Sequence, residues 1–277
     1  MPTGRHERYW ESPLGDDPDA TGYVNGMVRR SCLVLIALTI AGCGSSHERS
    51  ATTTNAAPAS ASKAPEPVQI CADAGGGWRK LTFHAHGTGI EAAVLGDGDP
   101  GVVFANDSGN SACGWMSFAR QLVGRGMRVL AFEYDDESRA AAEGLAAARA
   151  LRAAGARHVA MIGASIGGRA VVQAAARDHG TLAAGVSLSA ERSVGANLRE
   201  ILPLARRIQV PSLYVGSRDD GYTTFGRDTR QFHRVTPAKV NRMLLVPGAD
   251  HGVDLLSDEN GPRVRKTILA FLEANAR

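Results

Sequence analysis

The chain has 277 residues, 44% of them hydrophobic, and a formal net charge of +3 at pH 7. This length and apolar content suffice for one domain with a sizeable core plus additional segments. The weak net charge and the 5% aromatic content argue against nucleic acid as a partner.

The first marked feature is an apolar run at residues 32–41, which follows a basic segment at 27–30 and ends in small residues before Cys43. The run is too short to span a bilayer and has the layout of a cleaved signal. It resembles a bacterial lipoprotein signal peptide whose lipobox is residues 40–43. The resemblance implies cleavage before Cys43, lipidation of that cysteine and an extracytoplasmic location on the cell membrane. A chance hydrophobic patch is the alternative, and the export route stays open.

The chain is therefore expected to have four parts. Residues 1–26 are polar and are interpreted as a non-native extension before a true start at Met27. Residues 27–42 are the signal peptide. Residues 43–67 are rich in Ser, Thr, Ala and Pro and are expected to form a disordered tether. Residues 68–277 are expected to fold.

The folded part alternates short apolar runs with longer helical patterns, which predicts an α/β domain. Strands are predicted at 80–86, 89–95, 101–105, 128–134, 159–162, 182–188, 211–216 and 241–247. Helices are predicted at 115–125, 137–156, 169–177, 197–207, 230–236 and 262–275. This order predicts a mostly parallel sheet with helices on both faces, in which the opening strand pair can be antiparallel.

The pattern G-x-S-x-G occurs at Gly163 to Gly167, between a predicted strand and a predicted helix. In this context it predicts a nucleophile elbow with Ser165 exposed at the tip and its hydroxyl in a cleft. Glycine is needed on either side because a side chain there would collide with the neighbouring strand or helix. A glycine-rich turn without chemistry, or a phosphate cradle, would be the alternatives.

The strand order and the elbow after the fifth strand resemble the α/β-hydrolase family over about residues 78–277. Only about twenty residues, 190–210, separate the two strands between which many members carry a large cap. The chain therefore resembles the minimally capped, dienelactone-hydrolase-like branch. Dienelactone hydrolases usually have a cysteine nucleophile, whereas this chain has Ser165, so their reaction does not carry over.

In this family the acid follows the strand two beyond the elbow, and the histidine follows the last strand. The resemblance implies Asp219, in Gly216-Ser-Arg-Asp219, as the orienting acid, with the adjacent Asp220 as the alternative. His251 follows the last predicted strand and completes the chain order Ser, acid, His.

The oxyanion hole of such a site is formed by backbone N–H groups. The residue after the nucleophile, Ile166, would supply one of them. The loop after the third strand would supply the other, and spacing back from Trp115 favours Ser108, with Asp107 as second choice. The family usually has His-Gly at positions 106 and 107, so the identity of this second donor stays open.

Two cysteines, Cys71 and Cys113, remain in the mature domain and are expected to form a disulfide in an oxidising compartment. Two buried thiols would be the alternative. His84 and His86 lie two apart on a predicted strand, but without a third ligand of suitable spacing an ordinary strand face is favoured over a metal site.

These features together predict an exported, lipid-anchored serine hydrolase of carboxylic esters that needs no cofactor or metal. Its partners would be a small-molecule or lipid acyl-ester substrate and, through the lipid, the membrane. The same residues would also suit a peptidase, thioesterase or lipase. A catalytically silent binding module on the cell surface is the non-enzymatic alternative.

Overall fold

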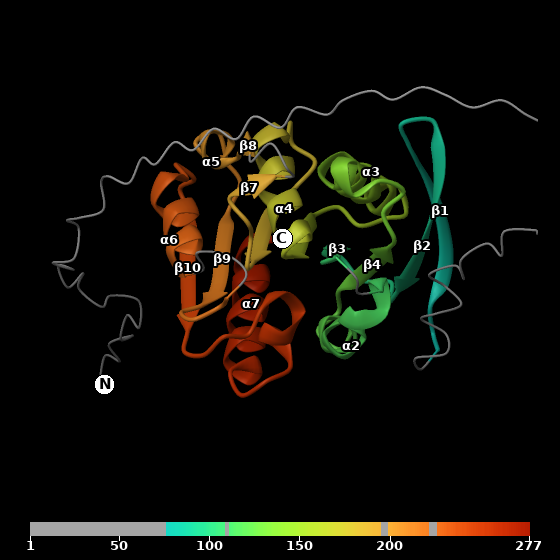
Figure 1. The fold of residues 1–277 in the computed structure, drawn as a ribbon. Helices are drawn as coiled ribbons and strands as arrows, with labels where there is room; N and C mark the ends of the chain where they lie inside the picture. The colour runs from blue at the N-terminus through green and yellow to red at the C-terminus, as the bar shows by residue number, and fades with distance from the viewer. Residues whose placement is uncertain (1–75, 109–110, 195–198, 222–225) are drawn as a thin grey trace, which may run out of the picture. The chain divides into compact units, whose positions relative to one another are not determined.

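The computed structural model describes residues 76–108, 111–194, 199–221 and 226–277. An eight-stranded mixed sheet with the order β1-β2-β4-β3-β5-β6-β9-β10 forms its centre (Figure 1). β1 pairs with β2 and β2 pairs with β4 in antiparallel orientation, and the other neighbours are parallel. The prediction of a mostly parallel sheet with an antiparallel opening pair is confirmed.

The strands of the sheet coincide closely with the predicted apolar runs. Their bounds are β1 Arg79–Ala85, β2 Thr88–Leu95, β3 Gly101–Ala105, β4 Arg128–Phe132, β5 Val159–Ala164, β6 Ala184–Leu188, β9 Ser212–Ser217 and β10 Asn241–Val246. Every residue of β3, β5, β6 and β9 is buried. This agrees with continuous apolar runs, because a parallel sheet is covered on both faces.

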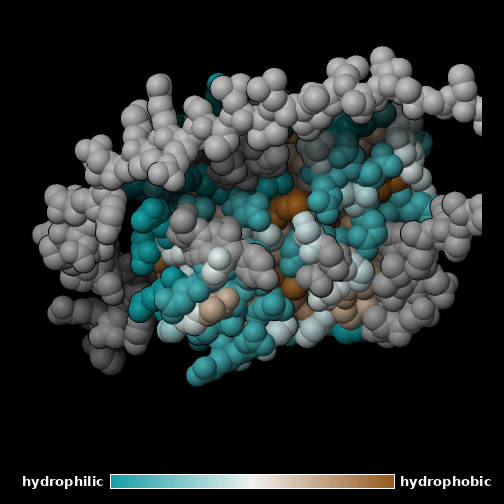
Figure 2. Space-filling model, in the orientation of Figure 1, coloured by the Kyte–Doolittle hydropathy of each residue, from teal (hydrophilic) through white to brown (hydrophobic). Residues whose placement is uncertain are grey.

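The main helices are α2 Met116–Val123, α3 Ala140–Ala153, α4 Ile166–Arg177, α6 Gly226–Val235 and α7 Gly261–Asn275. Short 3-10 turns, η1 Ala112–Trp115 and η2 Glu137–Arg139, precede α2 and α3. α2 and α7 cover one face of the sheet, and α3, α4 and α6 cover the other (Figure 1). Figure 2 shows that hydrophilic residues dominate the side in view, with small, separate hydrophobic areas.

The segment between β6 and β9 differs from its prediction. The sequence predicts a helix at 197–207, but the structure has a hairpin of β7 Ser193–Val194 and β8 Arg199–Glu200, followed by the four-residue α5 Leu202–Ala205. Pro203 lies in the first turn of α5. Proline is tolerated there because its missing N–H has no intrahelical partner, whereas it would interrupt a longer helix. The prediction of a small cap agrees with this short segment.

In the ranges that the structure describes, no helix is long and apolar enough to cross a bilayer. The predicted signal peptide, the lipidated Cys43 and the tether all lie outside those ranges.

Candidate active site

Ser165 occupies the turn between β5 and α4, as the G-x-S-x-G pattern predicts. Its backbone has φ of 52° and ψ of −114°, a conformation that is unfavourable for a residue with a side chain. Two backbone hydrogen bonds of 2.9 Å hold it there, from the Ser165 N–H to the Leu188 carbonyl and from the Arg169 N–H to the Ser165 carbonyl. Retained strain of this kind is typical of functional sites.

The glycines on either side of Ser165 have the steric role that the sequence predicts. A Cβ atom added to Gly163 would lie 2.1 Å from the carbonyl oxygen of Gly167. One added to Gly167 would lie 2.0 Å from the carbonyl oxygen of Ala105, the last residue of β3. The first turn of α4 therefore packs directly against the end of β3, and the loop after β3 is held beside Ser165.

Ser165 is less accessible than predicted, with 7% of its surface exposed. The loop after β10 packs against the turn, because a Cβ atom at Gly252 would lie 3.7 Å from the Cβ atom of Ala164, and Gly167 brings the residues after β3 against the same turn, since its Cβ would lie 2.5 Å from the Asn106 carbonyl oxygen. His251, which precedes Gly252, thus belongs to the same cluster. Among the described residues no hydrogen bond joins Ser165 to His251, and such bonds are often long before a substrate binds.

The carboxylate that contacts His251 belongs to Asp220, so the choice of Asp219 is corrected. His251 Nδ1 lies 2.8 Å and 3.0 Å from the two carboxylate oxygens of Asp220. Asp220 is 1% exposed, whereas Asp219 faces solvent. The Asp219 N–H donates to the Gly248 carbonyl at 3.0 Å, which joins the loops after β9 and β10. The side chain of Asp220, the next residue, turns inward toward the imidazole.

The electrostatic environment of His251 favours the charged imidazole. Burial lowers the pKa of His251, but the hydrogen bond and charge of Asp220 and the charges of Glu191 and Asp107 raise it more. The pKa of His251 is therefore raised above its ordinary value. An ionised Asp220 accepts a hydrogen bond from the N–H at Nδ1, which leaves Nε2 as the atom that can take a proton from a neighbour.

The loop after β3 is fixed by the side chain of Asn106, a residue that sequence reasoning did not assign a role. Its amide nitrogen donates to the Phe132 carbonyl at 3.0 Å and to Glu133 Oε2 at 3.2 Å. Its amide oxygen accepts from Trp115 Nε1 at 3.0 Å. Asn106 is buried, and a polar residue directly after a buried strand is the sequence signal that would have identified it.

The predicted oxyanion donors lie on the two segments that meet at Ser165. Ile166 is the first residue of α4, where N–H groups are free of intrahelical partners. Ser108 is exposed in the turn after β3. The choice between the N–H groups of Ser108 and Asp107 stays a prediction.

Two further charged residues lie near the site and were not singled out from the sequence. Arg169, on α4, is 8% exposed, and its Nη1 atom lies 3.0 Å from Oε2 of Glu191 in the loop after β6. Their positions follow from the same rule that places Ser165, because the carboxyl ends of neighbouring parallel strands meet at one edge of the sheet.

Cys113 is buried in η1, and Cys71 lies outside the described residues. The predicted Cys71–Cys113 disulfide therefore stays a prediction. In the part of the chain that the structure describes, no group of three or more His, Cys, Asp or Glu residues could hold a metal ion.

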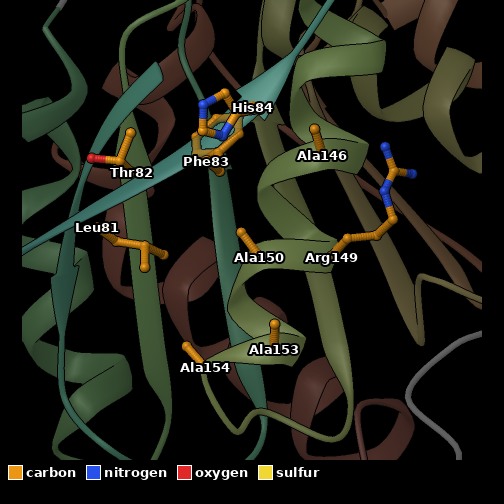
Figure 3. Close-up of a pocket in the computed structure, with 9 residues that line it drawn as sticks. All are labelled: Leu81, Thr82, Phe83, His84, Ala146, Arg149, Ala150, Ala153 and Ala154. Atoms are coloured by element: carbon orange, nitrogen blue, oxygen red, sulfur yellow. The ribbon is translucent and has the colours of Figure 1, made fainter. Parts of the chain in front are cut away.

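A separate groove of about 510 Å³ lies between β1 and α3. Figure 3 shows its two walls, one from the strand and one from the helix. Its lining residues are Leu81, Thr82, Phe83, His84, Ala146, Arg149, Ala150, Ala153 and Ala154. None of them is among the residues that surround Ser165 and His251, so this groove is distinct from the candidate active site.

No protein-family model matches the sequence, and no curated protein matches it significantly. Solved structures do match the fold. An esterase of Pyrococcus furiosus has a TM-score of 0.61 and 13% identity over 72% of this chain and 92% of that chain. A Klebsiella pneumoniae structure named as a dienelactone hydrolase has a TM-score of 0.58 and 20% identity, over 71% and 98% of the two chains.

A monoacylglycerol lipase of Paleococcus ferrophilus has a TM-score of 0.59 and 15% identity, over 67% of this chain and 98% of that chain. The sheet order and these similarities establish the α/β-hydrolase fold that the sequence predicts. At these identities the similarity concerns the fold alone.

Proposed function

We propose that the domain is a serine hydrolase that cleaves carboxylic esters, with Ser165 as nucleophile, His251 as base and Asp220 as orienting acid. The proposal rests on the close association of a strained serine turn with a histidine that contacts a buried carboxylate. Ser165 is held in a strained turn at the N-terminus of α4, and His251 contacts a buried carboxylate on the adjacent loop. A nucleophile, a base and an acid in this order are the parts that acyl transfer needs. The esterase and lipase folds among the similar structures support the same reaction class.

In the first half of the proposed reaction, His251 Nε2 takes the proton of the Ser165 hydroxyl as its oxygen attacks the acyl carbon. The negative charge that develops on the carbonyl oxygen is stabilised by the N–H groups of Ile166 and Ser108. Asp220 stabilises the imidazolium that forms. The tetrahedral intermediate then collapses, the bond to the alcohol breaks, and His251 returns its proton to the leaving oxygen.

In the second half, a water molecule attacks the acyl-Ser165 ester. His251 Nε2 takes a proton from this water, and the same N–H groups hold the second tetrahedral intermediate. Cleavage of the bond to Ser165 releases the carboxylic acid, and the proton on His251 returns to the serine oxygen. Water and ester are the only reactants, so the steps of the cycle balance without a cofactor.

Kinetics of single and double variants would test this proposal. Ser165→Ala and His251→Ala should each remove nearly all turnover of short-chain esters, and the double variant should be little worse, because the two residues act as one unit. Ser212→Ala is a suitable control, since this serine lies at the amino end of β9, away from the site. Ester hydrolysis retained by a well-folded Ser165→Ala protein would refute the proposal. A panel of acyl-chain lengths on the unaltered protein would separate a short-chain esterase from a lipase.

We further propose that the chain is exported and anchored to the bacterial membrane by lipid on Cys43. The basic segment, the short apolar run and the lipobox at residues 40–43 support this proposal. Two or more acyl chains at one cysteine would hold the domain firmly on a membrane. Mass spectrometry of the mature N-terminus tests the idea, and an unmodified Cys43 in a soluble protein would contradict it.

A disulfide between Cys71 and Cys113 also belongs to the proposal. It would tie the segment before β1 to η1, which follows the loop that carries Ser108. Thiol counting on the unreduced mature protein should find neither cysteine free, and two free thiols would exclude the bridge.

A further inference from the structure

Asp107 is a carboxylate at the candidate active site that the proposed reaction does not use. It follows β3 and is 9% exposed. Its Oδ1 atom is buried and, among the described residues, has no hydrogen-bond partner. Its Oδ2 atom lies 2.8 Å from the position that a Cβ atom of Gly252 would take. Asp107 therefore lies against the residue that follows His251.

A buried carboxylate oxygen without a donor is costly, because it loses hydration and gains no hydrogen bond in return. Within the described ranges six buried side-chain polar atoms lack a partner, and three of them lie where strands of the sheet end at this edge. These three are Asp107 Oδ1 after β3, Ser189 Oγ after β6 and Ser217 Oγ at the end of β9. Two of these three oxygens follow β3 and β6, the strands on either side of β5, which carries Ser165.

The other carboxylates near His251 have partners among the described residues. Asp220 contacts the imidazole itself, and Glu191 is paired with Arg169 at 3.0 Å. Asp107 has no such partner in the described part of the chain, and its charge reaches the same imidazole. Of these three carboxylates, Asp107 is the one for which the described residues supply no ion pair.

We propose that Asp107 determines substrate specificity by receiving a cationic group, an ammonium close to the scissile ester. The proposal rests on the proposed ester hydrolysis by Ser165 and His251. Charge-assisted hydrogen bonds are the strong ones, and a site that leaves a buried polar group unpaired discriminates strongly against an analogue that lacks the partner. An ester with an apolar chain at the same place would leave Asp107 buried and unsatisfied.

Matched ester pairs would test the proposal, because the members differ in charge and hardly in shape. On the acyl side, β-alanine ethyl ester is compared with ethyl butyrate. On the alcohol side, acetylcholine is compared with 3,3-dimethylbutyl acetate. In the unaltered protein, kcat/KM should be at least about tenfold higher for the cationic member of one or both pairs. Asp107→Asn should remove most of this preference while changing kcat/KM of the neutral esters much less.

The matched control is Asp219→Asn, which removes the same charge from an exposed carboxylate outside the cluster. It should leave the cationic preference unchanged. Equal rates within both pairs for the unaltered protein, or a preference that persists in Asp107→Asn, would overturn the proposal. So would a preference that Asp219→Asn removes to the same degree.

A second measurement needs neither turnover nor a variant. Two methylphosphonate esters, one with a thiocholine leaving group and one with 3,3-dimethylbutanethiol, should label Ser165 at different rates, with the cationic reagent faster. Added salt should slow the cationic reagent selectively. Equal labelling rates at low and high salt would overturn the role of Asp107 while leaving the serine hydrolase intact. Absence of labelling by either reagent, together with no turnover of any ester, would instead refute the proposed function.

Discussion

Replacement of Asp220 by asparagine should almost abolish activity, while the same change at Asp219 should not. The new amide would keep the shape of the buried side chain but could present an N–H toward Nδ1 of His251, where the carboxylate of Asp220 now accepts a hydrogen bond. The imidazole would then carry its proton on Nε2, the atom that must receive the proton of Ser165. The expected loss in kcat is about 10⁴-fold, which corresponds to about 5.4 kcal/mol in the activation barrier.

Asp219→Asn is the matched control for Asp220→Asn, because it makes the same chemical change at the neighbouring residue. Asp219 contributes its backbone N–H to the bond with Gly248, and an asparagine retains that N–H. Since its carboxylate is exposed, kcat should change by less than about threefold. Initial rates of p-nitrophenyl acetate hydrolysis, with melting temperatures as a folding control, would measure both. If Asp219→Asn lost as much activity as predicted for Asp220→Asn, and Asp220→Asn were nearly unaffected, the assignment of the acid would be refuted.

The remaining predictions concern packing, pH and the anchor. Gly167→Ala should destabilise the fold by about 3 kcal/mol or more, because its Cβ would lie 2.0 Å from a backbone carbonyl oxygen of β3. Gly114→Ala is the control, since its Cβ would meet nothing within 4 Å. Equal melting temperatures of the two variants would contradict the steric argument. His251 must be neutral to act as base, and its pKa is raised, so kcat/KM should be lost as the pH falls through a midpoint above 6.5. Asp107→Asn should move this midpoint to lower pH, because it removes a negative charge that raises the pKa of His251. An unshifted midpoint would exclude this effect of the Asp107 charge. Cys43→Ala should leave an uncleaved or mislocalised precursor, which cell fractionation and immunoblotting would detect. Lipidation of Cys43 would be contradicted if this variant were processed and localised to the membrane normally.

Much of the fold could be predicted because its elements have strong local signals. The buried parallel strands are short apolar runs between turns, and the sequence predicts each of them to within a few residues. The elbow is equally predictable, since the glycines at 163 and 167 are required by contacts shorter than any side chain tolerates. Local sequence is a sufficient guide where the signal itself lies within a few residues, as the G-x-S-x-G pattern does, even though the contact that requires Gly167 is with β3.

The acid and the short hairpin are not determined by local sequence. Asp219 and Asp220 are chemically identical neighbours. Which of them turns inward depends on the packing of the loop after β9 against the loop after β10, which the bond from the Asp219 N–H to the Gly248 carbonyl joins. The β7–β8 hairpin likewise depends on pairing between two segments of two residues each, too short for a periodic pattern. The environment of Asp107 emerges only when the loops after β3 and β10 meet.

The central claim is that Ser165 is the nucleophile of this domain, and its covalent labelling tests that claim most directly. The protein should react with one equivalent of a fluorophosphonate, and peptide mass spectrometry should locate the added mass on Ser165. Ser165→Ala should take up no label while keeping its melting temperature. A label located on another residue, or full labelling of a folded Ser165→Ala protein, would contradict the account.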